Sequence, residues 1–290
     1  MKKIFSIIAG IACMSMVACS NESIEENTEP SEPEEAPIAA HISTRADNNL
    51  ASQGGVFMVY GSMQSADNYL NNMCLTNEGN GNWSSDQQIY WKDKTTHTDF
   101  YAYSPYAANI ADVLAHSFQV QTDQSNAEKQ KSSDFLWGKL VDQKPTGEVL
   151  NMTLGHIFSR AIIRVTPGEG FTEDELKNGT LSVRINGVRI QATIDLSNGN
   201  VTAAGSAQTI IPMKEQDLTY SAIVVPQQVE KTGLVTVSWS GTDYTFTSSM
   251  QFASAKQYTF TVTMKKTAGG INVGIGGWED AGEDFGGTVN

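Results

Sequence analysis

Cysteine is scarce in this chain of 290 residues, which contains only Cys13, Cys19 and Cys74. The first two lie in or beside an apolar N-terminal stretch, so Cys74 is the only thiol left in the rest of the chain. An intramolecular disulfide is therefore not expected, and the fold must be stabilised by burial of apolar side chains. The chain is long enough for that, and long enough for two hydrophobic cores.

Basic residues are also few. Nineteen lysines and arginines stand against 32 aspartates and glutamates, which gives a formal net charge of −13. Nucleic-acid binding needs a basic stripe that displaces counterions, so nucleic acid is excluded as a partner. Seven glutamates lie between Glu22 and Glu35, in a stretch that also contains Pro30, Pro33 and Pro37. Such a segment cannot bury enough apolar surface to fold, so residues 19–36 are expected to form an acidic disordered tether. An acidic docking tail is the alternative.

Long apolar runs are absent except at the start of the chain. Lys2 and Lys3 precede a short apolar stretch that ends in Met16-Val17-Ala18 before Cys19. It falls short of the roughly 20 residues that a membrane-spanning helix needs. We therefore predict a lipoprotein signal peptide over residues 1–18, with lipid attachment at Cys19. The expected location is the outer membrane or cell surface, with an ordinary secretory signal as the alternative.

Catalytic and metal-binding patterns are missing as well. The four histidines are far apart and form no cluster with cysteines or carboxylates at ligand spacing. No Gly-x-Ser-x-Gly nucleophile motif occurs. We expect no enzyme activity, no metal and no cofactor.

Short runs rich in β-branched and aromatic residues fill the chain after residue 37, separated by Gly, Asn, Asp and Ser clusters. This pattern predicts an all-β protein of sandwich or barrel type. The expected strands are Gly55–Tyr60, Asp99–Tyr103, Val149–Leu154, Ile157–Thr166, Leu181–Arg189, Gln208–Met213, Thr219–Val225, Leu234–Trp239, Tyr244–Thr247 and Gln257–Lys265.

Turn and cap signals complete this secondary structure. Asn186-Gly187 and Ser240-Gly241 offer the positive φ angles of tight hairpins. A capping box at Thr172 predicts one short helix that stops at Asn178-Gly179. A break at Lys144–Gly147 divides the chain into an N-terminal sandwich (37–146) and a C-terminal sandwich with an acidic, glycine-rich tail (147–290).

Aromatic residues gather between residues 83 and 106. Along Asp99–Tyr103, Tyr101 and Tyr103 share one face of the expected strand and Phe100 shares the other with Ala102. The two tyrosines are candidate surface aromatics for a sugar or a protein partner. The favoured alternative places both faces in the core, because aromatic residues dominate sandwich cores.

Several phrases of the sequence, taken in order, resemble the fimbrillin family, the type V pilus subunits of Bacteroidetes. They are Trp83, Ile89-Tyr90-Trp91, Asp99–Pro105, Asp134–Gly138, Leu154–Ala161, Ile223–Gln227, Tyr258–Val262 and Ile271–Val273 leading to Trp278. The resemblance implies two transthyretin-like β-sandwich domains in tandem after the signal peptide and tether. It also implies export by the lipoprotein machinery and assembly with other pilin subunits into a pilus.

The same resemblance implies that an arginine-specific protease removes the first strand. Residues 37–45 carry Ile38, Ala40 and Ile42 on one face, and Arg45–Ala46 is the candidate cut. A strand from a neighbouring subunit would then replace the lost one by strand addition. The alternative is that residues 37–45 stay in place as an ordinary first strand.

The sequence does not decide which segment of the neighbouring subunit donates this strand. Ile271, Val273 and Ile275 alternate well, but the family pattern makes this phrase the last strand of its own domain. The tail beyond it has only Phe285 and Val289 as anchors, a poor strand composition. Stalk, tip and anchor positions therefore all remain open. The rival function is a lipid-anchored adhesin or glycan-binding protein, with a host or bacterial surface ligand, that does not polymerise.

Overall fold

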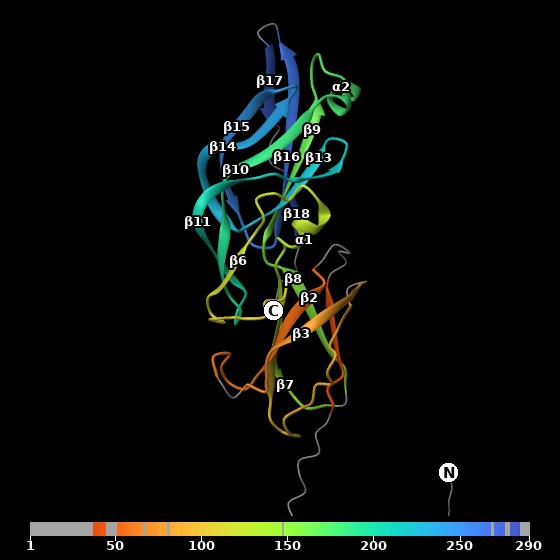
Figure 1. Cartoon of the computed structure of the whole chain (residues 1–290), viewed down its shortest axis with the longest axis vertical. Helices are drawn as coiled ribbons and strands as arrows, with labels where there is room; N and C mark the ends of the chain where they lie inside the picture. Colours follow the sequence, from red (N-terminus) through yellow and green to blue (C-terminus); the bar gives the residue numbers. More distant parts are fainter. Residues whose placement is uncertain are drawn as a thin grey trace, which may run out of the picture. The chain divides into compact units, whose positions relative to one another are not determined.

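The computed structural model describes residues 37–44, 51–65, 68–79, 82–146, 148–267, 270–275 and 279–284. All of them belong to one compact unit, Glu35–Asn290. Strands dominate this unit, and only two short helices occur among the described residues (Figure 1). The all-β prediction is confirmed. Cys19, Arg45, Ala46, Phe285 and Val289 lie outside the described residues.

The first sheet closes into a seven-stranded barrel. In spatial order its strands are β1 (Ala40–Thr44), β4 (Asn82–Ser84), β3 (Leu70–Gly79), β2 (Gln53–Val59), β5 (Thr98–Ser104), β7 (Leu136–Gln143) and β8 (Leu150–His156). All neighbours are antiparallel except β1 and β8, which are parallel. Closure leaves this sheet without a free edge.

Two further sheets contain the remaining strands. The first has the order β11-β10-β14-β15, with β6 added to β10; its strands are β6 (His116–Gln119), β10 (Leu181–Asp195), β11 (Asn200–Ile210), β14 (Gln227–Trp239) and β15 (Thr242–Phe252). The second has the order β12-β13-β9-β16-β17, with β18 also on β16; its strands are β9 (Ser159–Pro167), β12 (Met213–Gln216), β13 (Thr219–Val224), β16 (Lys256–Thr267), β17 (Gly270–Ile275) and β18 (Glu279–Asp284).

The described residues form two hydrophobic clusters. The barrel cluster contains Ile38, Ile42, Val56, Met58, Leu75, Trp83, Trp91, Phe100, Ala102, Leu136, Met152 and Leu154. The larger cluster is built mainly from the other two sheets and also takes up the opposite face of β2 and β5. Both faces of β5 are therefore in contact with apolar groups, with Phe100 and Ala102 in the barrel cluster and Tyr101 and Tyr103 against the larger one.

A segment that precedes residue 146 packs on strands that follow it. β6 pairs antiparallel with β10, as Figure 1 shows. The side chain of Gln124 donates to the carbonyls of Gln121 and Ile223 and accepts from the Ile223 amide. Gln130, in helix α1 (Ala127–Lys131), donates to Ser221. The division at residue 146 and the transthyretin-like description stay predictions.

Local predictions met with mixed outcomes. Helix α2 (Glu173–Asn178) has the predicted capping box, and Ser240-Gly241 forms the predicted hairpin turn between β14 and β15. The hairpin at Asn186-Gly187 is wrong, because Gly187 (φ +74°) forms a bulge within β10. The single strand Gln208–Met213 is wrong too, because β11 ends and β12 begins on either side of Pro212, which lacks an amide hydrogen. Helix α1 was not predicted.

Candidate functional site

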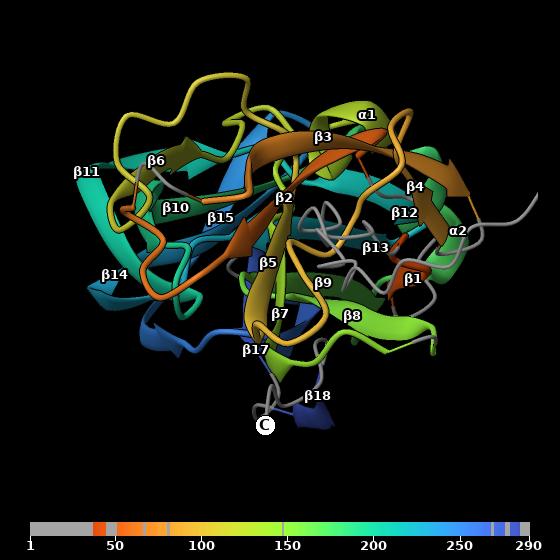
Figure 2. The same cartoon turned by 90° about the horizontal axis from the view of Figure 1, so that it is seen from below.

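The first strand, β1, closes the barrel between β4 and β8 (Figure 2). It pairs with β8 at five consecutive positions, from Ala40 to Thr44, and with β4 at only two. Beyond its start, the amide of Ile38 donates to the carbonyl of Ile89 at 2.8 Å, and Gln88 Nε2 donates to the carbonyl of Ile38 at 3.1 Å. The backbone of this segment is thus held most regularly on its β8 side.

The inward side chains of the first-strand segment are the two predicted isoleucines. Ile38 and Ile42 are 6% and 7% exposed and belong to the barrel cluster. Burial of one such side chain contributes about 1.5–3 kcal/mol. Ala40, predicted on the same face, is exposed and lines an open hollow of about 250 Å³. Ile38 and Ile42 line the same hollow, and the methyl group of Ala40 between them is too short to fill it.

Unpaired polar atoms surround the same strand. Among the described residues, Thr44 Oγ1 and the indole nitrogens of Trp83 and Trp91 are buried without a hydrogen-bond partner. Trp83 lies directly opposite Ile42 across β1 and β4. A buried polar group without a partner costs about 1–3 kcal/mol. Thr44 is part of β1, so its unpaired hydroxyl group offsets some of the gain from the two isoleucines.

The predicted processing and lipid sites are not placed. Thr44 is the last described residue before the next described range begins at residue 51. The cut at Arg45–Ala46 and the lipid site at Cys19 therefore remain predictions.

Tyr103 is not a surface aromatic. Its side chain is 1% exposed and packs against Phe57 and Phe135, with ring centroids 6.2 and 5.8 Å away. Its hydroxyl donates to Asn72 Oδ1 at 2.7 Å, and burial raises its pKa to about 12. Tyr101 is half-buried against the same cluster. The surface hypothesis is wrong for Tyr103, because the segment after β5 packs over its hydroxyl group at Ala107. For Tyr101 it stays a prediction.

The candidate donor residues Ile271, Val273 and Ile275 are part of the chain's own sheet. They lie in β17, which runs antiparallel to β16 from Thr267↔Gly270 to Val262↔Ile275. β18 continues along the same edge of β16, from Thr259↔Glu279 to Lys256↔Asp284. The C-terminal stretch thus follows one edge of β16 over two successive pairings.

One buried pair was missed by the sequence analysis. His156 Nδ1 lies 2.7 Å from Asp134 Oδ2, and both side chains are nearly fully buried. His156 ends β8 and Asp134 precedes β7, so the pair joins the turn regions of two barrel strands. No spacing in the sequence could signal it, because 22 residues separate the partners along the chain.

Metal-binding clusters and membrane-spanning helices are both absent from the described residues. They contain no group of three or more His, Cys, Asp or Glu side chains that could hold a metal ion. Within the same ranges, no helix is long and apolar enough to cross a bilayer.

Solved structures with a similar fold include proteins from Bacteroides and Porphyromonas. A candidate cell adhesion protein from Bacteroides uniformis is 21% identical, with a TM-score of 0.66 over 84% of this chain and 97% of that one. Another from Bacteroides ovatus is 17% identical, with a TM-score of 0.65 over 86% and 98%. The tip fimbrial protein Mfa3 of Porphyromonas gingivalis, with a C-terminal truncation, is 9% identical, with a TM-score of 0.53 over 84% and 100%.

A family model identifies the chain more directly. No curated protein sequence is similar enough to count as a match. The family model described as fimbrillin-like matches residues 44–278, from the last residue of β1 to the residue before β18. Since this match spans most of the sequence, the chain belongs to the fimbrillin-like family.

Proposed function

We propose that the protein is a structural subunit of a surface pilus. It is exported as a lipoprotein through Cys19, cut near Arg45 and assembled with other pilin subunits by strand exchange. Membership of the fimbrillin-like family supports the pilus role. The observation that carries the assembly step is the position of β1, because this short first strand alone joins β4 to β8.

Removal of the segment from residue 37 to the end of β1 has two physical consequences. It strips the barrel cluster of Ile38 and Ile42, whose burial contributes about 1.5–3 kcal/mol each. It also exposes the pairing edges of β8 and β4, and such edges readily add an extended strand. A strand from a neighbouring subunit satisfies both needs at once, so cleavage and polymerisation are coupled.

The donor strand comes from the C-terminal stretch of another copy or of a related pilin. β17 pairs with β16 at six positions, whereas β18 pairs at three and carries four acidic residues among six. Release of the β18 region, together with Phe285 and Val289 beyond it, therefore costs less than release of Ile271–Ile275. Donation by residues 279–289 leaves β17 in its own sheet.

The N-terminus of the protein taken from cells tests this proposal. We expect Ala46 as first residue in heat-resistant polymer ladders on detergent gels. Arg45→Gln should keep a lipidated Cys19 and abolish the ladders. Arg45→Lys is the matched control, because it keeps the charge and should still resist an arginine-specific protease. Ladders built from uncut wild-type chains would contradict cleavage-dependent assembly.

The rival function is a lipid-anchored adhesin that does not polymerise. Its proposed surface has lost support, since Tyr103 is buried. The same experiment separates the two functions. A wild-type chain that stays lipidated, uncut and monomeric would favour the adhesin.

A further inference from the structure

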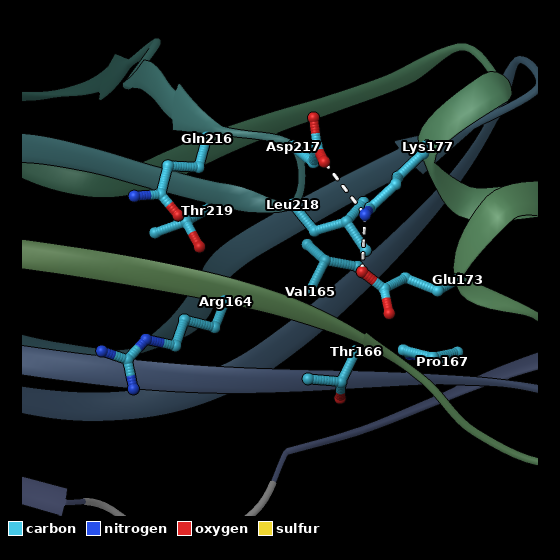
Figure 3. Close-up of a pocket in the computed structure, with 10 residues that line it drawn as sticks. All are labelled: Arg164, Val165, Thr166, Pro167, Glu173, Lys177, Gln216, Asp217, Leu218 and Thr219. Atoms are coloured by element: carbon cyan, nitrogen blue, oxygen red, sulfur yellow. Dashed lines mark ion pairs between the residues drawn. The ribbon is translucent and has the colours of Figure 1, made fainter.

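An open hollow lies on the outer face of the sheet that contains β9 and β13. Its volume is about 380 Å³, at the lower end of the range of small-molecule sites. Side chains from β9, helix α2 and the turn before β13 line it (Figure 3). This hollow is separate from β1 and from the strands expected to exchange.

The lining of the hollow includes one arginine, Arg164, and the hydroxyl groups of Thr166 and Thr219. Arg164 on β9 is exposed and sits in register between Thr219 on β13 and Thr261 on β16. Two residues on, Thr166 and Thr263 are also paired, with their hydroxyl oxygens 3.0 Å apart. A guanidinium flanked by hydroxyl groups offers a fork of donors beside groups that both donate and accept.

The other cation of the hollow is already neutralised. Lys177 Nζ lies 2.7 Å from Glu173 Oε1 and 3.0 Å from Asp217 Oδ2, and Figure 3 shows it turned toward both. Its hydrogen bond lowers the pKa of Asp217, so this carboxylate stays ionised at neutral pH. Arg164 lies toward the other end of the hollow, and the structure gives it no ion pair or hydrogen bond among the described residues.

Arg160, on the same face of β9, shows what a structural arginine does in this sheet. It forms an ion pair with Glu215. Glu215 also accepts a hydrogen bond from Ser221, which in turn accepts one from Gln130 of helix α1. Arg164 has no such partner among the residues that the structure describes. Its guanidinium is therefore available to an anion from solution.

We infer that this hollow binds an acidic sugar. Arg164 binds the sugar carboxylate as a bidentate partner, which is the geometry that a guanidinium fork favours. The hydroxyl groups of the sugar bond to Thr166, Thr219, Gln216 and the carboxylate of Asp217. A neutral sugar lacks the carboxylate for the charged bidentate bond, and a simple anion has no hydroxyl group to donate to Asp217. Recognition therefore requires both functions on one ring.

Titration of the purified full-length protein with D-glucuronate and with glucose, followed by NMR, tests the inference. We expect saturable shifts with glucuronate only, localised to β9 and β13. Arg164→Gln should weaken glucuronate binding at least about tenfold, as expected for a lost hydrogen bond to a charged group. Arg164→Lys should fall in between, because lysine keeps the charge but not the fork.

Arg189→Gln is the matched control. Arg189 is an exposed arginine on β10 in the other sheet, and its loss changes the net charge equally. Glucuronate affinity should be unchanged in this variant. Equal weakening by both substitutions, equal binding of glucuronate and glucose, or no glucuronate shifts at 20-fold molar excess and above would each overturn the inference.

Discussion

Ile42 on β1 lies directly opposite Trp83 on β4, and both side chains are buried in the barrel cluster. The contact joins the segment expected to leave the protein with a residue that stays. It also places an indole nitrogen without a hydrogen-bond partner beside that segment. The balance between apolar burial and unpaired polar atoms at this contact determines how firmly the first strand is held.

The contribution of β1 can be measured on the uncut chain. Ile42→Ala should lower the free energy of unfolding by about 2–5 kcal/mol, the usual cost of such a truncation in a core. Urea denaturation gives this quantity. His41→Ala, at the exposed neighbouring position, should change it by less than about 0.5 kcal/mol. A loss below 1 kcal/mol at Ile42 would show that side-chain burial does not hold β1.

Gln124 should be essential for attaching the segment before β7 to β13. Its side chain is fully buried and makes two hydrogen bonds to the backbone of Ile223. Gln124→Leu leaves both backbone groups unpaired and should cost about 2–4 kcal/mol in urea denaturation.

The same change at the exposed Gln119 serves as the control and should cost less than about 1 kcal/mol. Hydrogen exchange adds a local measurement. The Ile223 amide should lose protection in Gln124→Leu and keep it in Gln119→Leu. Unchanged protection in both would contradict the attachment.

Stability should fall in mild acid, partly through His116. Burial among aromatic rings lowers the pKa of this imidazole in the folded protein. Below about pH 6.5 the unfolded chain takes up a proton that the folded chain resists, so stability rises with pH through this range. His116→Phe should therefore show a shallower loss of stability between about pH 7 and 5. Parallel pH profiles of the two proteins would exclude this contribution.

Two glycines with positive φ should respond differently to substitution by alanine. At Gly187 (φ +74°) a new Cβ would lie 2.7 Å from Thr232 Cγ2, whereas at Gly241 (φ +82°) no atom lies within 4 Å. Gly241→Ala should cost about 1–2 kcal/mol from backbone strain alone. Gly187→Ala should cost more in thermal or urea unfolding.

Removal of the crowding methyl group tests the explanation. Thr232→Ser should recover part of the loss in Gly187→Ala and have no such effect in Gly241→Ala. Additivity of the two changes at residues 187 and 232 would rule out the contact as the cause.

The sequence predicted elements well where a period or a local motif determines them. β5 alternates as expected, since side chains of a strand point to opposite faces. The capping box of α2 is a contact between residues three apart, so the sequence alone contains it. Ile38 and Ile42 were identified as the inward side chains of the first strand for the same reason.

Features that depend on distant partners could not be predicted. The exposure of Tyr103 to water depends on the segment after β5, which packs over it. That segment has no regular apolar pattern from which its position could be predicted. Asn186-Gly187 has the composition of a hairpin turn, and only the pairing of β10 with β11 and β14 makes it a bulge. Among the described residues, Arg164 has no ion-pair partner, because Asp217 and Glu173 pair with Lys177 instead. The sequence cannot show which acidic residues the fold brings near.

The mixed pairing of β1 determines the direction in which a replacement strand must run. A strand that takes its place has unlike neighbours, because β1 runs parallel to β8 and antiparallel to β4. An insert of reversed orientation would exchange these two relationships and meet the wrong hydrogen-bonding pattern on both sides. Subunits joined through this gap would therefore all point the same way. A filament of this kind would have two different ends, and growth at one of them would not be equivalent to growth at the other.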